Sequence, residues 1–153
     1  MKETQRISKL LDQLYHGPSW IEVNILSVIQ EITAKQAATK VLQNCNSIWE
    51  IINHLISWRE EILQRVQGNI KESPADNYFR PIMDSSETAW TTTLQKLEQS
   101  QRDWLELLAS FDPDILEKSY PSGRFTYYEL FHGIIQHDAY HLGQIVLLAK
   151  QHH

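Results

Sequence analysis

The feature that most constrains the fold is a helical spacing of apolar residues in three long stretches without proline. Each stretch contains a side-chain acceptor followed three residues later by glutamate, the pattern of a helix-capping box. The three pairs are Ser47 with Glu50, Asp84 with Glu87, and Thr126 with Glu129. Apolar residues then recur every three or four positions over 48–66, 90–108 and 130–148. The sequence therefore predicts three long helices.

A shorter helix is predicted around 7–14, where it ends at His16-Gly17-Pro18, and a further helical piece is predicted over 20–32. No segment alternates with period two, so we expect no sheet. Four principal helices in one domain, 1–153, predict an all-α four-helix bundle. The connection over 69–83 is long for a bundle. It predicts either a crossover between the second and third long helices or a flap over a site.

Two glycines interrupt the last predicted helix. Gly133 and Gly143 each cost about 1 kcal/mol relative to alanine inside a helix. We expect the close approach of a neighbouring helix, or of a partner chain, to offset this cost.

Charge and composition exclude several classes of partner. The net charge is −5 and no stripe of lysine and arginine is present, so nucleic acid is not an expected partner. No apolar run approaches the roughly 18 residues of a membrane span, and the N-terminus lacks the apolar core of a secretory signal. The single cysteine, Cys45, cannot form an internal disulfide and is typical of a reducing compartment. We therefore expect a cytoplasmic protein.

A pair of histidines in the last helix indicates a metal site. His137 and His141 are four residues apart, so their side chains lie one turn apart on one face. At about 100° per residue, they share the core-facing stripe of Leu130, Ile134 and Ile145. Histidines in such a stripe need polar partners, and one metal ion supplies a partner for both.

The third ligand is expected from a facing helix. His54 is the one histidine within 48–66, and it lies on the apolar side of that helix. Three imidazoles suit zinc, nickel, iron or copper, of which we expect zinc, nickel or iron, and they leave coordination positions open. His132 points about 160° away from the pair and is expected at a surface or interface. His16 fits a turn, and the terminal His152 and His153 receive no role.

Further site residues follow from their angles on the helix. Gln144 lies about 40° from the centre of the histidine stripe and can reach the metal-bound water or a substrate. Asp138 lies about 80° away and is expected to orient an imidazole or to join a neighbouring helix. Glu50, one turn before His54, either accepts a proton from that ring or only caps its helix. Tyr140 is a candidate for positioning substrate. The candidates for the entrance are Tyr78, Phe79 and Arg80.

The histidine segments resemble the DinB/YfiT-like metal-binding four-helix bundles. HGIIQHDAYHLGQIVLLAK is similar to the family's His-x-x-x-His-x-Gly-Gln-Ile signature, and NSIWEIINHLISWREEIL to the segment with its first histidine. YHGPSW resembles one branch of the family. The resemblance places the family's three metal ligands on His54, His137 and His141, and it implies a long crossover and a homodimer. Many members carry arginine where this chain has Leu142, so an anion-binding role is not carried over to that position.

The leading functional hypothesis is an enzyme whose divalent metal activates water or a thiol for attack on a small substrate. The resemblance implies a metal-dependent hydrolase or, alternatively, a thiol S-transferase that uses a low-molecular-weight thiol as cofactor. No carboxylate stands out as general base, which favours direct attack by the bound nucleophile. Two other classes remain open: a non-catalytic metal-binding module, and a metal-free helical dimer with hydrogen-bonded histidines.

Overall fold

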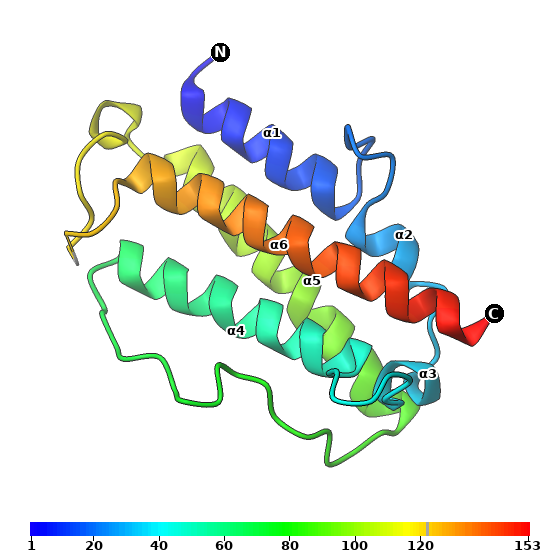
Figure 1. Ribbon diagram of the computed structural model, residues 1–153. Coiled ribbons are helices and arrows are strands. Elements are labelled where there is room, and N and C mark those ends of the chain that lie inside the picture. Colours follow the sequence, from blue (N-terminus) through cyan, green and yellow to red (C-terminus); the bar gives the residue numbers. More distant parts are fainter. Residues whose placement is uncertain (122) are drawn as a thin grey trace.

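The computed structural model describes residues 1–121 and 123–153, and 62% of the chain is helical. Four long helices make up most of it: α1 (Glu3–Tyr15), α4 (Ile48–Val66), α5 (Glu87–Ser110) and α6 (Tyr127–Ala149) (Figure 1). Two short helices, α2 (Ile25–Ile29) and α3 (Ala34–Ala38), follow α1, and two 3-10 turns lie at Pro113–Ile115 and Lys150–His152. The described residues form no strand, which confirms the predicted all-α class.

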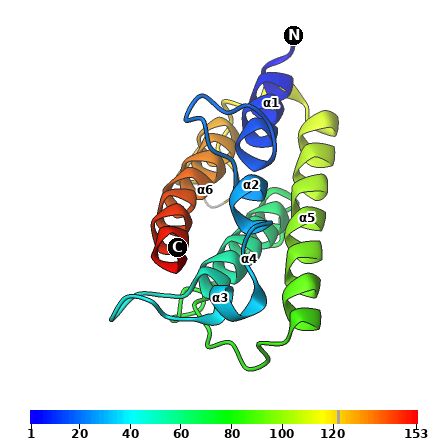
Figure 2. The same ribbon diagram turned by 90° about the vertical axis from the view of Figure 1, so that its right-hand side faces the viewer.

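The long helices contact one another in a ring. α4 packs against α5 and α6, and α1 packs against the same two helices. The turned view places α5 and α6 on opposite sides of the molecule (Figure 2). The chain between α4 and α5 leaves one end of α4, runs along that helix and enters α5 at the other end (Figure 1). None of the described helices combines the length and the hydropathy that a membrane crossing requires.

Capping chemistry explains where the helices begin. The boxes of Ser47 with Glu50 and of Thr126 with Glu129 form as predicted at the starts of α4 and α6. The predicted box of Asp84 with Glu87 is wrong. Ser86 caps α5 instead, with its side chain accepting from the Ala89 amide, while Asp84 accepts from the Ser86 amide in a tight turn.

Other local expectations are also corrected. The helical piece predicted over 20–32 shrinks to α2, since Asn24 caps a helix only at Ile25 and Trp20 is 96% exposed in the preceding turn. α3 was not predicted, although Thr33 and Gln36 form its capping box.

A methyl group at Gly133 or Gly143 would meet nothing within 4 Å. A neighbouring helix of the same chain therefore does not compensate for these glycines.

The core consists of two hydrophobic clusters. One contains Leu55 of α4 with Leu97 of α5 and Leu142 of α6, and the other contains Ile62, Trp104 and Ile134 of the same three helices. Within each helix a buried polar residue lies between the two clusters in sequence. These residues are Arg59, Gln101 and Asp138. A layer of buried polar groups therefore crosses the bundle close to the predicted histidine site.

Candidate metal site

His54, His137 and His141 come together between α4 and α6. One ring nitrogen from each lies within 4.8 Å of the others. The Nε2 atoms of His54 and His137 are 3.0 Å apart. Two nitrogens bound to one tetrahedral metal ion at about 2.0–2.1 Å would lie roughly 3.3 Å apart. The structure thus unites the three residues that the sequence selected, and the triad could hold a metal ion.

The tautomers of two rings suit metal ligation. His54 Nδ1 donates to the backbone carbonyl of Asn77 at 2.7 Å, and His141 Nδ1 donates to Gln144 Oε1 at 2.6 Å. Each ring in its neutral form then keeps a lone pair on Nε2 that is free to bind a metal ion. Among the described residues, no hydrogen-bond partner reaches the buried Nδ1 of His137.

The electrostatics keep the three rings neutral. Burial lowers the pKa of His54 and of His141 below the ordinary value for histidine. Burial, together with the neighbouring His141 and His54 rings, lowers the pKa of His137 to about 3. Neutral imidazole is the form that binds a metal ion. The donor set therefore fits a transition-metal ion at physiological pH.

The α4–α5 connection supplies a partner that the sequence did not reveal. Asn77 accepts from His54 through its backbone and from the Trp58 indole through its side chain, at 2.9 Å. Asn77 and Tyr78 have φ values of 51° and 64°, in the left-handed region that asparagine tolerates better than most residues. Phe79 stacks flat on His54, with ring centroids 4.0 Å apart. The connection therefore contributes to the site, because Asn77 and Phe79 hold the ring of one histidine.

The other predicted site residues divide into two groups. Gln144 and Tyr140 line the pocket beside the triad, and Gln144 donates to the Tyr140 hydroxyl at 3.3 Å. Gln144 is thus a direct partner of a histidine. Glu50 does not reach His54, since its carboxylate accepts from the Ser47 amide at 2.7 Å and pairs with Lys40. The proton-accepting alternative for Glu50 is wrong, and its capping alternative is confirmed.

Of the three entrance candidates, only Phe79 lines the pocket. Arg80 pairs with Asp76 and lies over the Tyr78 ring, outside the pocket wall. Leu142 is fully buried in the core and does not line the pocket.

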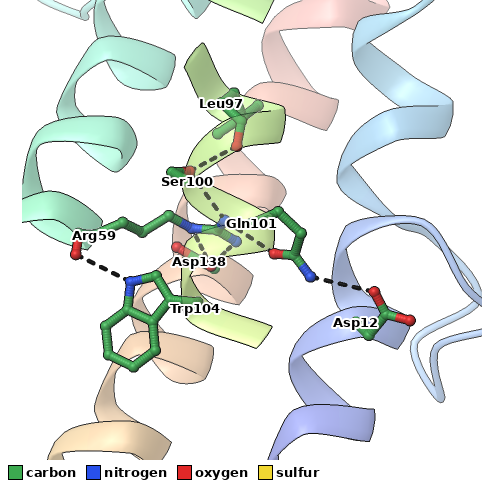
Figure 3. A network of polar contacts seen from close by, with 7 residues as sticks. All are labelled: Asp12, Arg59, Leu97, Ser100, Gln101, Trp104 and Asp138. Atoms are coloured by element: carbon green, nitrogen blue, oxygen red, sulfur yellow. Dashed lines mark hydrogen bonds and ion pairs between the residues drawn. The ribbon is translucent and has the colours of Figure 1, made fainter. Parts of the chain in front are cut away.

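Asp138 joins a neighbouring helix, and among the described residues its carboxylate forms no hydrogen bond with an imidazole. Its Oδ2 accepts from Arg59 Nη2 at 2.6 Å and from Nε at 3.0 Å, and both side chains are at most 1% exposed. Arg59 also donates to Gln101 and Ser100 of α5 (Figure 3). Burial raises the pKa of Asp138, and the charge of Arg59 opposes this shift.

This pair joins the same two helices that carry the triad. Asp138 follows His137 in α6, and Arg59 lies five residues after His54 in α4. The ion pair therefore fixes the spacing of the two helices that carry the histidines. Arg59 was missed because a single arginine in an amphipathic helix is normally expected on the solvated face.

A large pocket opens beside the triad. Its volume is about 1080 Å³, and its walls come from α4, α6 and the α4–α5 connection. His132, excluded as a ligand, lines another part of this pocket, where its ring packs at a tilt of 46° against Tyr128 with ring centroids 4.4 Å apart. The triad thus has protein on one side and open volume on the other.

Comparison with known proteins agrees with this geometry. The model of the DinB superfamily matches residues 20–145, which include α4, α5 and the three histidines. Searches among curated proteins and among solved structures gave no match. On the evidence of the family match, this chain belongs to the DinB superfamily.

Proposed function

We propose that the protein is a metal-dependent enzyme, a hydrolase of a small substrate, whose ion is held by His54, His137 and His141. One observation carries the proposal: three neutral imidazoles converge at the wall of a pocket of about 1080 Å³. A site with three protein ligands and an open side is the arrangement of catalytic metals, whereas structural sites usually close with four ligands. Such an ion supplies Lewis acidity and lowers the pKa of water.

Residues of this chain would hold the histidine rings and orient the substrate. Asn77 and Gln144 fix two of the three rings through their Nδ1 atoms. The Tyr140 hydroxyl, held by Gln144, can orient a substrate at the pocket edge. Glu129 is the one carboxylate of the described pocket wall, and it accepts from the Thr126 amide at the start of α6. It therefore has a capping role, and the described pocket wall offers no other carboxylate to act as a general base.

The quaternary and architectural parts of the proposal are a homodimer and a four-helix bundle with a crossover between α4 and α5. The contact ring of the long helices and the path of the α4–α5 connection support the bundle. The open space at Gly143, which lies outside the pocket, supports a dimer, because close packing by a second chain would offset the cost of this glycine in α6. Sedimentation equilibrium tests this state, and a monomer at all concentrations would contradict it.

The activity is tested with zinc-, nickel- and iron-loaded protein against ester and amide substrates, with chelated protein as the control. We expect hydrolysis only with metal, while circular dichroism of the chelated protein shows the helices intact. Unfolding on chelation would instead indicate a structural ion. A thiol with an electrophilic substrate belongs in the same panel, and transfer without hydrolysis would replace the hydrolase assignment by the thiol transferase.

A further inference from the structure

The pocket is much larger than the triad. Sites for small molecules commonly have volumes of about 300–1,000 Å³, and this pocket reaches about 1080 Å³. The histidines occupy only part of its wall, and the rest extends along α4 and α6 as far as Ile62 and Tyr128. A substrate bound at the metal therefore has room for a long second part, here called the tail.

Aromatic and aliphatic side chains form the wall around the tail. The Trp58 and Tyr128 rings are half-buried there, and Phe125 is 41% exposed at the edge. The aliphatic members are Ile62, Leu130 and Ile134. Burying an apolar tail against such a wall contributes about 25 cal/mol per Å² of surface removed from water.

The charges of the wall residues also favour an uncharged tail. Among the described residues of the wall there is no lysine or arginine, and Glu129 is the one acidic residue. An anionic tail that lies away from the metal would lose its hydration without a cation beside it, and Glu129 would repel it. An uncharged tail meets neither cost.

Two arginines lie close to the wall without belonging to it. Arg65 lies over the Trp58 ring at 5.6 Å but pairs with Glu61 and donates to Ser73. Arg124 lies over the exposed Phe125 at 5.0 Å, at the solvent edge. Arg65 is thus already neutralised, and Arg124 is surrounded by water that screens its charge.

We propose that this pocket selects substrates with a metal-binding head and an uncharged aromatic or aliphatic tail, and that it discriminates against negatively charged tails. The inference rests on the proposed function, because the head is placed by the metal. It also restricts the thiol S-transferase alternative to thiols without carboxylate groups, because a thiol that carries carboxylates would not suit this wall.

Three hydroxamic acids share one chelating head and test the proposal. Acetohydroxamic acid is the head alone, 4-phenylbutanohydroxamic acid adds an aromatic tail, and succinic acid monohydroxamate adds a carboxylate tail. Calorimetric titration of the zinc-loaded protein gives each Kd. We expect the aromatic tail to tighten binding by about tenfold over the head alone. The carboxylate tail is expected to give no gain.

The outcomes distinguish a failure of the proposed function from a failure of the tail selectivity alone. If zinc does not load, or acetohydroxamic acid does not bind, the proposed function fails. If acetohydroxamic acid binds and the carboxylate tail binds as tightly as the aromatic one, or more tightly, only the tail selectivity is overturned. An aromatic tail that adds nothing to the head also overturns it.

Matched variants locate the tail. Phe125→Ser removes an aromatic side chain of the wall, and we expect it to weaken the aromatic probe about threefold while acetohydroxamic acid is unaffected. Leu147→Ser, at an exposed position of α6 outside the pocket, is its control. Gln136→Lys places a cation in the wall and should tighten the carboxylate probe about fivefold, whereas Gln151→Lys should not. Equal effects of the wall variants and their controls would contradict this placement of the tail.

Discussion

The buried pair of Arg59 and Asp138 offers a sharp test of how the site is built. Asp138→Asn keeps the size of the side chain and removes its charge, which leaves the Arg59 guanidinium without its anionic partner. Both side chains are at most 1% exposed, so water cannot replace the lost partner. Removing one partner of such a pair costs about 3–5 kcal/mol of unfolding free energy. For a domain of this size that lowers the Tm by roughly 6–20 °C.

The reverse variant, Arg59→Met, should respond differently to pH. It leaves the Asp138 carboxyl buried without its cation, so burial raises the pKa of that group in the folded state. The folded state then binds more protons than the unfolded state above the ordinary pKa of about 3.9. The loss in Arg59→Met should therefore be smaller at pH 5 than at pH 8, whereas the loss in Asp138→Asn should not show this trend.

Urea unfolding of metal-free wild type, Arg59→Met, Asp138→Leu and the double variant that combines these two substitutions closes one double-mutant cycle, and Asp138→Asn is measured beside it. The double variant replaces both charges by apolar groups, and we expect it to be more stable than Asp138→Asn by at least about 2 kcal/mol. A loss below about 1 kcal/mol in Asp138→Asn would refute the buried ion pair. A double variant as unstable as the sum of its single variants would refute the coupling.

Three further predictions concern the ligands and their partners. Gln144→Leu removes the acceptor for His141 and should weaken zinc binding about tenfold or more in competition with a chelator, whereas Gln144→Glu should not. Asn77→Val should weaken zinc binding more than Asn77→Gly, because valine disfavours the φ of 51° that points the backbone carbonyl at His54, whereas glycine adopts it easily. Equal losses in the two variants would contradict this. The lowered pKa of His137 means that metal-free protein loses unfolding free energy as the pH falls from about 6.5 toward 3, because the unfolded state then binds more protons. In urea titrations at several pH values, His137→Gln should reduce this dependence of the unfolding free energy on pH. An unchanged dependence would contradict the prediction.

Helix-capping residues and apolar periodicity predicted much of the fold. α4 runs over the predicted 48–66, because capping and apolar spacing act within a few residues and both are visible in sequence. The same periodicity placed His54, His137 and His141 on facing stripes. α2 and α3 were harder to predict, since five-residue helices depend on packing more than on their own propensity.

Contacts between distant residues were not accessible in this way. Asn77 is exposed and lies in an irregular connection, and only the folded chain brings its carbonyl to His54, 23 positions earlier. Arg59 and Asp138 are likewise 79 positions apart, so their pairing depends on the packing of α4 against α6. Periodicity shows which face of a helix is buried. It does not show which polar groups meet there.

The central claim is that one divalent ion is held by the three histidines, and metal content tests it most directly. Protein prepared without an added tag and without His152 and His153 is incubated with zinc, desalted and analysed by elemental mass spectrometry. The account predicts about one zinc per chain, a loss of most of this zinc in each alanine variant of His54, His137 and His141, and full retention in His132→Ala. A wild-type chain that stays metal-free, or a His54→Ala variant that keeps full occupancy, would contradict it.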